Sequence, residues 1–248
     1  MKALATYNIK GGVGKTTAAV NLACLAAWEG RRTLLWDLDP QGAASYLLRV
    51  RPHVKGGGKA LIRGKKTLDQ AAKATELNNL DLAPADLTYR HMDLVLDAAK
   101  KPTQRIARLL ATVSGDYDVV ILDCPPGMSL VSENVLHAVD VLLVPLIPTT
   151  LSVRTLEQLT ELVADLDHPP ALFPFFSMVD GRKRLHREVI DRLRAERDDV
   201  AATVIPARSL IEQMAVRRAP LPVFAPHSQV TGRYEKLWAE VLRAAFSS

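Results

Sequence analysis

The chain has 248 residues, enough for one large α/β domain or two small ones. Hydrophobic residues make up 48% of it and charged residues 24%, as in globular proteins with a sizeable core. The longest apolar stretch, around Val141–Val144, is too short to span a bilayer, and no leader-like segment precedes the first predicted strand. Two cysteines, at positions 24 and 124, are too few and too far apart for a disulfide framework or a paired-cysteine metal site. We therefore expect a cytoplasmic protein without integral membrane association.

Short β-branched apolar runs alternate with helical patterns along most of the chain. The predicted strands are Ala3–Tyr7, Thr33–Trp36, Leu80–Ala83, Val119–Leu122, Val141–Ile147, Leu172–Ser177 and Ala202–Ile205. The clearest predicted helices are Lys15–Trp28, Thr103–Val113, Ser152–Leu166 and Leu185–Arg197, with a final amphipathic helix that carries Tyr234, Leu237, Trp238, Val241, Leu242 and Ala245. This alternation predicts an α/β fold, a mainly parallel twisted β-sheet with helices on both faces, in a single domain of residues 1–248.

Basic residues exceed acidic ones slightly, 32 to 27, but they are unevenly distributed. Between Arg49 and Lys66 there are seven basic residues and no acidic one, and the tract reads as a long basic loop. Two further clusters follow in the C-terminal third, one of Arg182, Lys183, Arg184 and Arg187 and one of Arg217 and Arg218. Clusters of this kind are typical of proteins that bind a polyanion, although a single one can also be a solvated face.

A glycine-rich loop, IKGGVGKTT, connects the first predicted strand to the first predicted helix. The glycines allow successive backbone N–H groups to face a phosphate, and the helix adds the positive end of its dipole. In such loops the lysine that opens the helix, here Lys15, reaches the β- and γ-phosphates, and the next hydroxyl, Thr16, ligates Mg²⁺. The predicted nucleotide-binding residues are Gly11, Gly12, Val13, Gly14, Lys15, Thr16 and Thr17.

The usual pattern GxxxxGK[ST] would place its first glycine at position 9, which is Ile9. The loop instead reads KGGxGK[ST], and it resembles the deviant P-loop of the ParA/MinD family of ATPases. The resemblance implies that Lys10 is the signature lysine, which reaches across a dimer interface to the ATP of the other subunit. Read without the resemblance, Lys10 could also be an ordinary surface charge.

Acidic residues follow two other predicted strands. Asp37-Leu38-Asp39 resembles the family's switch I, in which the second aspartate, here Asp39, has the hydrolytic role. Asp37 either ligates Mg²⁺ or caps the loop. Val119–Asp123 is a Walker B pattern, so Asp123 would hold Mg²⁺. Cys124 begins a stretch that resembles switch II, and we expect it to be a small buried residue.

A loop near the C-terminus resembles the one that flanks adenine in the family. The matching positions are Pro206 and Arg208, although the family often has arginine directly after the proline, where this chain has Ala207. The chain has no room for the second, glutaminase domain typical of cobyrinate diamide synthases, and only Ser247 and Ser248 follow Phe246, which disfavours a membrane-binding tail.

The resemblance therefore implies a ParA-type ATPase with ATP and Mg²⁺ as cofactors. It would form an ATP-dependent homodimer, bind double-stranded DNA without sequence preference through Arg182, Lys183, Arg184, Arg187, Arg217 and Arg218, and associate with the nucleoid. A ParB-like or cargo adaptor protein would stimulate hydrolysis. A nucleotide-dependent adaptor or MinD-like positioning ATPase that does not bind DNA is the alternative. The sequence does not indicate the cargo.

Overall fold

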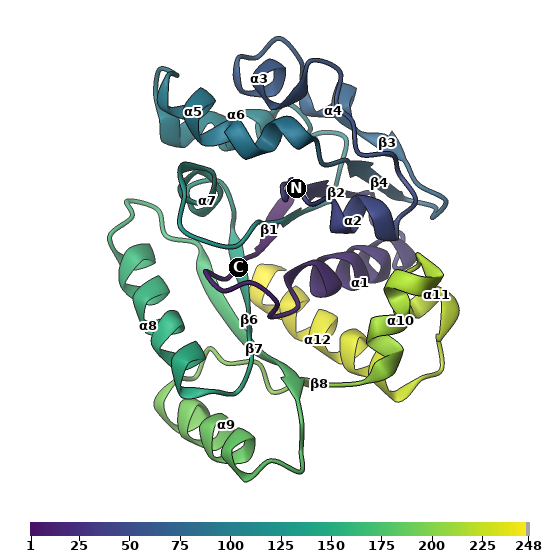
Figure 1. Cartoon of the computed structure of the whole chain (residues 1–248), viewed down its shortest axis with the longest axis vertical. Coiled ribbons are helices and arrows are strands. Elements are labelled where there is room, and N and C mark those ends of the chain that lie inside the picture. The colour runs from purple at the N-terminus through teal and green to yellow at the C-terminus, as the bar shows by residue number, and fades with distance from the viewer. Residues whose placement is uncertain (247–248) are drawn as a thin grey trace.

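Eight β-strands form one sheet in the computed structural model, which describes residues 1–246 (Figure 1). The strands are β1 (Lys2–Thr6), β2 (Thr33–Asp37), β3 (Lys73–Ala74), β4 (Leu80–Ala83), β5 (Val119–Asp123), β6 (Val141–Leu146), β7 (Ala171–Val179) and β8 (Val204–Pro206). Their spatial order is β3-β4-β2-β5-β1-β6-β7-β8, and every neighbouring pair is parallel except β3 with β4. The predicted fold class is confirmed, whereas the short edge strand β3 was not predicted.

Helices cover both faces of the sheet. The first group is α1 (Lys15–Trp28), α2 (Ala43–Leu47), α10 (Ser209–Arg217), α11 (Leu221–Phe224) and α12 (Gln229–Phe246). The second group is α3 (Gly57–Ile62), α4 (Leu68–Ala71), α5 (Met92–Asp97), α6 (Arg105–Ala111), α7 (Leu130–Leu136), α8 (Thr150–Ala164) and α9 (Arg184–Glu196), with two 3-10 turns at Leu87–His91 and Pro102–Gln104. Each group encloses its own apolar cluster against one face of the sheet.

The strands are apolar on both sides because both faces are covered. In β2, Leu34 and Trp36 belong to the cluster under α3–α9, while Leu35 belongs to the cluster under α1 and α12. All three side chains are fully buried. This double burial explains why the strands read as continuous apolar runs rather than as alternating patterns.

The last helix packs on the sheet as its periodicity predicts. On α12, Tyr234, Leu237, Trp238 and Val241 are buried, and the helix lies beside α1 (Figure 1). Ser247 and Ser248, on which the prediction of no membrane-binding tail depends, lie outside the described residues. Among residues 1–246, no helix has both the length and the apolar character needed to cross a bilayer.

The basic tract from Arg49 to Lys66 is not a loop throughout, so that prediction was wrong in part. Its middle forms α3, which buries Leu61 and Ile62 in the apolar cluster. Gly58 lets this helix approach its neighbours closely, because a Cβ there would lie 2.9 Å from the Tyr89 ring. Tertiary packing therefore orders a segment whose glycines and charges suggest an irregular loop.

Candidate functional site

The glycine-rich loop lies at the carboxyl end of β1 and leads directly into α1. Gly14 has a φ of 96°, and a Cβ there would lie 2.8 Å from Ser177 Oγ, so backbone conformation and contact with β7 both require glycine. Beside the loop is a cavity of about 330 Å³. It is lined by Gly11, Gly12, Gly14, Lys15, Thr16, Thr17, Asp39, Pro126 and Met178, and Val13 is buried. The loop prediction and the predicted Asp39 thus converge on one cavity.

The Lys15 side chain is held in place by the backbone of the segment that precedes the glycines. Its Nζ donates hydrogen bonds to the carbonyl oxygens of Asn8 (3.2 Å) and Lys10 (2.9 Å). Burial lowers the pKa of Lys15, while the charges of Asp123 and Asp39 act in the opposite direction. A cation that is withdrawn from water and held by two carbonyls is well prepared to bind an anion.

Two carboxylates meet where β2 and β5 end. Asp37 and Asp123 lie opposite each other in the register of these strands, and both are fully buried. Asp37 Oδ2 accepts hydrogen bonds from the Ser45 amide (2.8 Å) and hydroxyl (2.7 Å), and Asp123 Oδ1 accepts one from Thr6 Oγ1 (3.3 Å). Asp37 Oδ1 and Asp123 Oδ2 have no protein partner.

The electrostatics of this pair is unfavourable without a cation. Burial raises the pKa of Asp37 to about 6, against the lowering effect of its Ser45 hydrogen bonds. Burial and then the nearby Asp37 charge raise the pKa of Asp123 well above its usual value, while the neighbouring Thr16 hydroxyl lowers it. Two buried carboxylates that each leave one oxygen unpaired beside a hydroxyl fit a hard divalent cation.

The described residues contain no group of three or more His, Cys, Asp or Glu side chains that could hold a metal by itself. Mg²⁺ does not require such a group, because it is usually held by one or two carboxylates together with phosphates and water.

The second lysine of the loop occupies a different position from the first. Lys10 is partly exposed and is not among the residues that line the cavity of its own chain. Its amide donates to Asn8 Oδ1 (2.9 Å), which fixes the backbone there. The stretch that resembles switch II is tied to the same loop, since the Gly127 amide donates to the Ile9 carbonyl (2.9 Å). Cys124 is buried, as expected.

A second cavity, of about 570 Å³, lies at the ends of β7 and β8. It is lined by Val179, Asp180, Gly181, Arg182, Val204, Pro206, Ala207 and Arg208. The predicted Pro206 and Arg208 therefore share one cavity. Sequence reasoning missed Asp180 and the left-handed Met178 (φ 56°) at the end of β7. Asp180 comes directly after β7, much as Asp37 and Asp123 end their strands, so a similar pattern could have indicated it.

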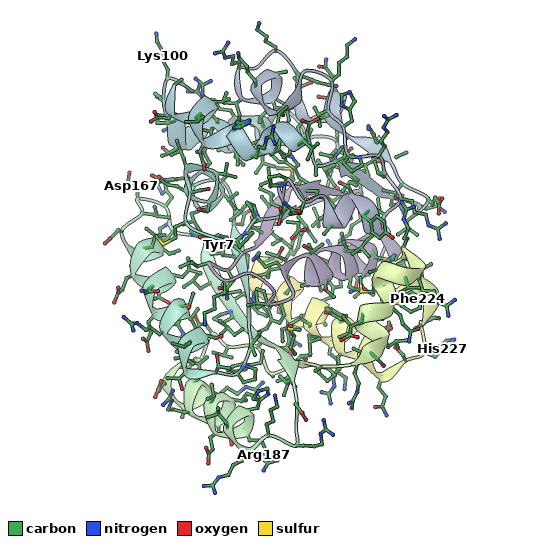
Figure 2. All side chains as sticks on the ribbon, viewed as in Figure 1. Tyr7, Lys100, Asp167, Arg187, Phe224 and His227 are labelled. Atoms are coloured by element: carbon green, nitrogen blue, oxygen red, sulfur yellow. The ribbon has the colours of Figure 1, made fainter. Side chains whose placement is uncertain are left out.

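The structure separates the basic residues predicted to bind DNA into two places. Those from Arg182 to Arg187 are exposed at the start of α9, and Arg187 projects away from the sheet (Figure 2). Arg182 pairs with Asp180 (3.0 Å) and Arg184 with Glu188 (2.6 Å). Arg217 and Arg218 end α10, at another corner of the molecule (Figure 1).

A strand, a glycine-rich loop and a helix that opens with Lys-Thr, beside acidic ends of two parallel strands, define a P-loop nucleotide-binding protein. The family model described as AAA domain matches residues 1–170. The chain is 32% identical over 250 residues to sporulation initiation inhibitor protein Soj of Bacillus subtilis, covering 97% of this chain and 98% of that protein. It is 30% identical to chromosome partitioning protein ParA of Myxococcus xanthus, over 95% and 86% of the two chains. This chain belongs to the ParA/MinD family of P-loop ATPases.

One solved structure bears on the sequence argument from chain length. Cobyrinic acid a,c-diamide synthase from Mycobacterium smegmatis, with bound ATP analog and magnesium, superposes with a TM-score of 0.85 at 28% identity. The match covers 100% of this chain and 96% of that chain. That solved chain is about as long as this one, so chain length alone does not distinguish this protein from one of that description.

Proposed function

We propose that this protein is an ATP-dependent switch that dimerises around ATP, binds double-stranded DNA without sequence preference and positions or segregates a cargo. The observation that carries the proposal is the pair of lysines in the loop. Lys15 is anchored inside the cavity, whereas Lys10 is left free of it and available to a second subunit. The similarity to Soj and ParA supports a ParA-type partitioning or positioning ATPase.

ATP and Mg²⁺ as cofactors are supported by the neighbouring structure with ATP analog and magnesium. We assign Gly11, Gly12, Val13, Gly14, Lys15, Thr16 and Thr17 to the phosphates, and Pro206 and Arg208 to the base side. Thr16, Asp37 and Asp123 would hold Mg²⁺, which when bound neutralises charge on the phosphates. The two unpaired carboxylate oxygens are the structural reason for this assignment.

Hydrolysis transfers the terminal phosphoryl group to water, so positioning and charge stabilisation matter more than a covalent nucleophile. Lys15 stabilises negative charge on the phosphate oxygens from within the subunit, and Lys10 of the other subunit adds a second cation. Asp39, at the cavity wall, orients the attacking water. Because Lys10 acts only in the dimer, a monomer hydrolyses ATP poorly.

The same proposal covers partners and location. A dimer joins basic residues of two subunits, and about four phosphate contacts from each subunit give a slope of log K against log salt near −7. A ParB-like or cargo adaptor protein stimulates hydrolysis and so releases the dimer from DNA. We accordingly place the protein in the cytoplasm, associated with the nucleoid.

The test is binding to random-sequence duplex DNA with ATP and with ADP, for wild type, Lys10→Ala and the control Lys236→Ala. Lys236 is an exposed lysine on α12, so the control loses one equal charge. We expect retention only with ATP, loss in Lys10→Ala and no change in the control. ATP-dependent dimerisation without DNA retention would favour the adaptor or MinD-like alternative. Phosphate release that depends on a small-molecule substrate and not on dimerisation would point to a ligase.

A further inference from the structure

The basic tract from Arg49 to Lys66 is ordered by hydrogen bonds and by burial of its apolar residues. At its start, the Val54 amide donates to Asp86 Oδ2 (2.8 Å), and inside α3 the Gly58 amide donates to Thr88 Oγ1 (2.9 Å). The apolar members Leu61 and Ile62 are buried beneath the helix. The polar face of α3 is therefore held in one orientation, directed away from the core.

The cations of this surface all point outward. We define the basic strip as the exposed residues Arg49, Arg51, Lys55, Lys59, Arg63 and Lys65. Of these, Arg49 has an ion pair, with Glu76 at 3.3 Å, and no ion pair of the other five is found within the described residues. No acidic residue occurs in the sequence from Ala43 to Leu68.

Like charges are crowded along the inner border of the strip. The Lys73 ammonium donates to the carbonyl oxygens of Arg51 (3.1 Å) and His53 (3.0 Å). Burial lowers the pKa of Lys73, and the charges of Lys66 and Arg51 lower it further. Repulsion of this kind is relieved when an anion binds.

The strip is continuous with one of the two predicted DNA-binding clusters. Arg49 Nε donates to the Arg218 carbonyl (3.2 Å), and Arg49 Nη2 donates to the Arg217 carbonyl (3.2 Å). Arg218 in turn stacks on the Tyr46 ring at 4.6 Å from its centroid. The segments that carry these residues run from the end of α10, past α2 and the edge strand β3, to α3 at the far end of the molecule (Figure 1).

The chemistry of the strip favours phosphates over an acidic protein. Stable protein interfaces use apolar or aromatic anchors at their centre. The exposed residues of α3 and its ends are lysine, arginine and glycine, and the exposed apolar side chains Tyr46 and Leu87 lie only at the two borders of the tract. A stretch of cations with no apolar anchor among them suits a regular array of phosphates, which is bound without base contacts.

We propose that the basic strip is a second contact surface for the phosphate backbone of double-stranded DNA, extending the Arg217–Arg218 corner along the β3 edge. The inference deepens the proposed function and rests on it, since it concerns the same DNA. Four contacts from the strip add about 3.6 to the salt slope for each strip that touches the duplex. Between 50 and 200 mM salt, a slope of that size corresponds to about a hundredfold in affinity.

The test removes four strip charges, in the variant Lys55→Gln, Lys59→Gln, Arg63→Gln and Lys65→Gln. A matched control removes four exposed charges elsewhere, at Lys100, Arg192, Arg233 and Lys236, so both variants lose the same net charge. DNA binding with ATP is measured across salt concentrations for both variants and for wild type. ATP-dependent dimerisation and thermal unfolding are measured in parallel to confirm that each variant folds.

We expect the strip variant to lose about 3.6 from the slope for each contacting strip, and the control to lose less than about 1. Equal slopes for the two variants, with wild type bound to DNA only in ATP, overturn the strip and leave the proposed function intact. Absence of wild-type binding at every salt concentration overturns both. Capture of polyglutamate in place of duplex DNA assigns the strip to an acidic protein and also overturns the inference. The double variant Lys59→Gln, Arg63→Gln repeats the test, with half the expected change, should the quadruple variant unfold.

Discussion

Replacing Asp37 by asparagine should stabilise the protein in the absence of Mg²⁺ and nucleotide. Burial raises the pKa of Asp37 from 3.8 to about 6, so the folded state holds this proton more tightly than the unfolded chain does. Stability is therefore lost as the pH rises from about 3.8 to about 6, and the loss is complete at about pH 7. That rise in the pKa of Asp37 corresponds to about 3 kcal/mol of lost stability at pH 7 and above. The asparagine side chain would keep an acceptor for Ser45, and its unpaired amide would cost about 1 kcal/mol, leaving a net gain of about 2 kcal/mol.

Urea unfolding at pH 7.5 and at pH 5, with a chelator and without nucleotide, measures this gain. The charge penalty removed by Asp37→Asn should be about half as large at pH 5, because pH 5 lies inside the titration range. Asp97→Asn, at an exposed carboxylate of α5, is the matched control and should change stability little. A destabilised Asp37→Asn at pH 7.5 would refute the reasoning, and so would a gain independent of pH. The same variant should lose Mg²⁺-dependent ATP hydrolysis.

Three further substitutions test how the site is assembled. Gly14→Ala forces a left-handed alanine against Ser177, so we expect about 1–2 kcal/mol of destabilisation and weaker binding of a fluorescent ATP analogue. Gly115→Ala, where a Cβ meets open space, is the control, and equal effects of the two substitutions would contradict the argument. Asn21→Leu removes the buried acceptor of the Leu221 amide (2.8 Å) and should cost about 1–3 kcal/mol in urea unfolding, whereas a cost near zero would show that the bond contributes nothing. Arg182→Ala should change ATP affinity, because this arginine pairs with Asp180 at the cavity between β7 and β8. For DNA binding it should lower the slope of log K against log salt by less than about 1, and a loss of a full unit would instead make Arg182 a phosphate contact.

Much of the site was predictable because it is local in sequence. Residues from Lys10 to Thr17 lie within one strand–loop–helix unit, and their spacing alone predicted the loop and its helix, which begins at Lys15 as expected. Asp37 and Asp123 each close a buried strand, a pattern that needs no knowledge of neighbours. The assigned roles of these residues stay predictions that the experiments above address.

Other features depended on contacts between distant segments. The sequence left open whether Asp37 is a metal ligand or a loop cap. The register of β2 with β5 places Asp37 opposite Asp123, and each carboxylate has one oxygen without a protein partner. The two basic clusters predicted to bind DNA lie at two corners, and Arg49, 168 residues away from Arg217 in sequence, contacts its carbonyl.

The sequence by itself determined the fold class and the phosphate loop, because hydrophobic periodicity and glycine spacing act within a single strand–loop–helix unit. Only the tertiary structure decided which carboxylates share a site, that α3 is a helix, and where the positive charges gather. Those properties arise from burial and from electrostatic interactions between segments that come together only when the sheet forms. For this reason the loop was read correctly from its residues, whereas the basic tract, taken as a loop, became an ordered surface only in the fold.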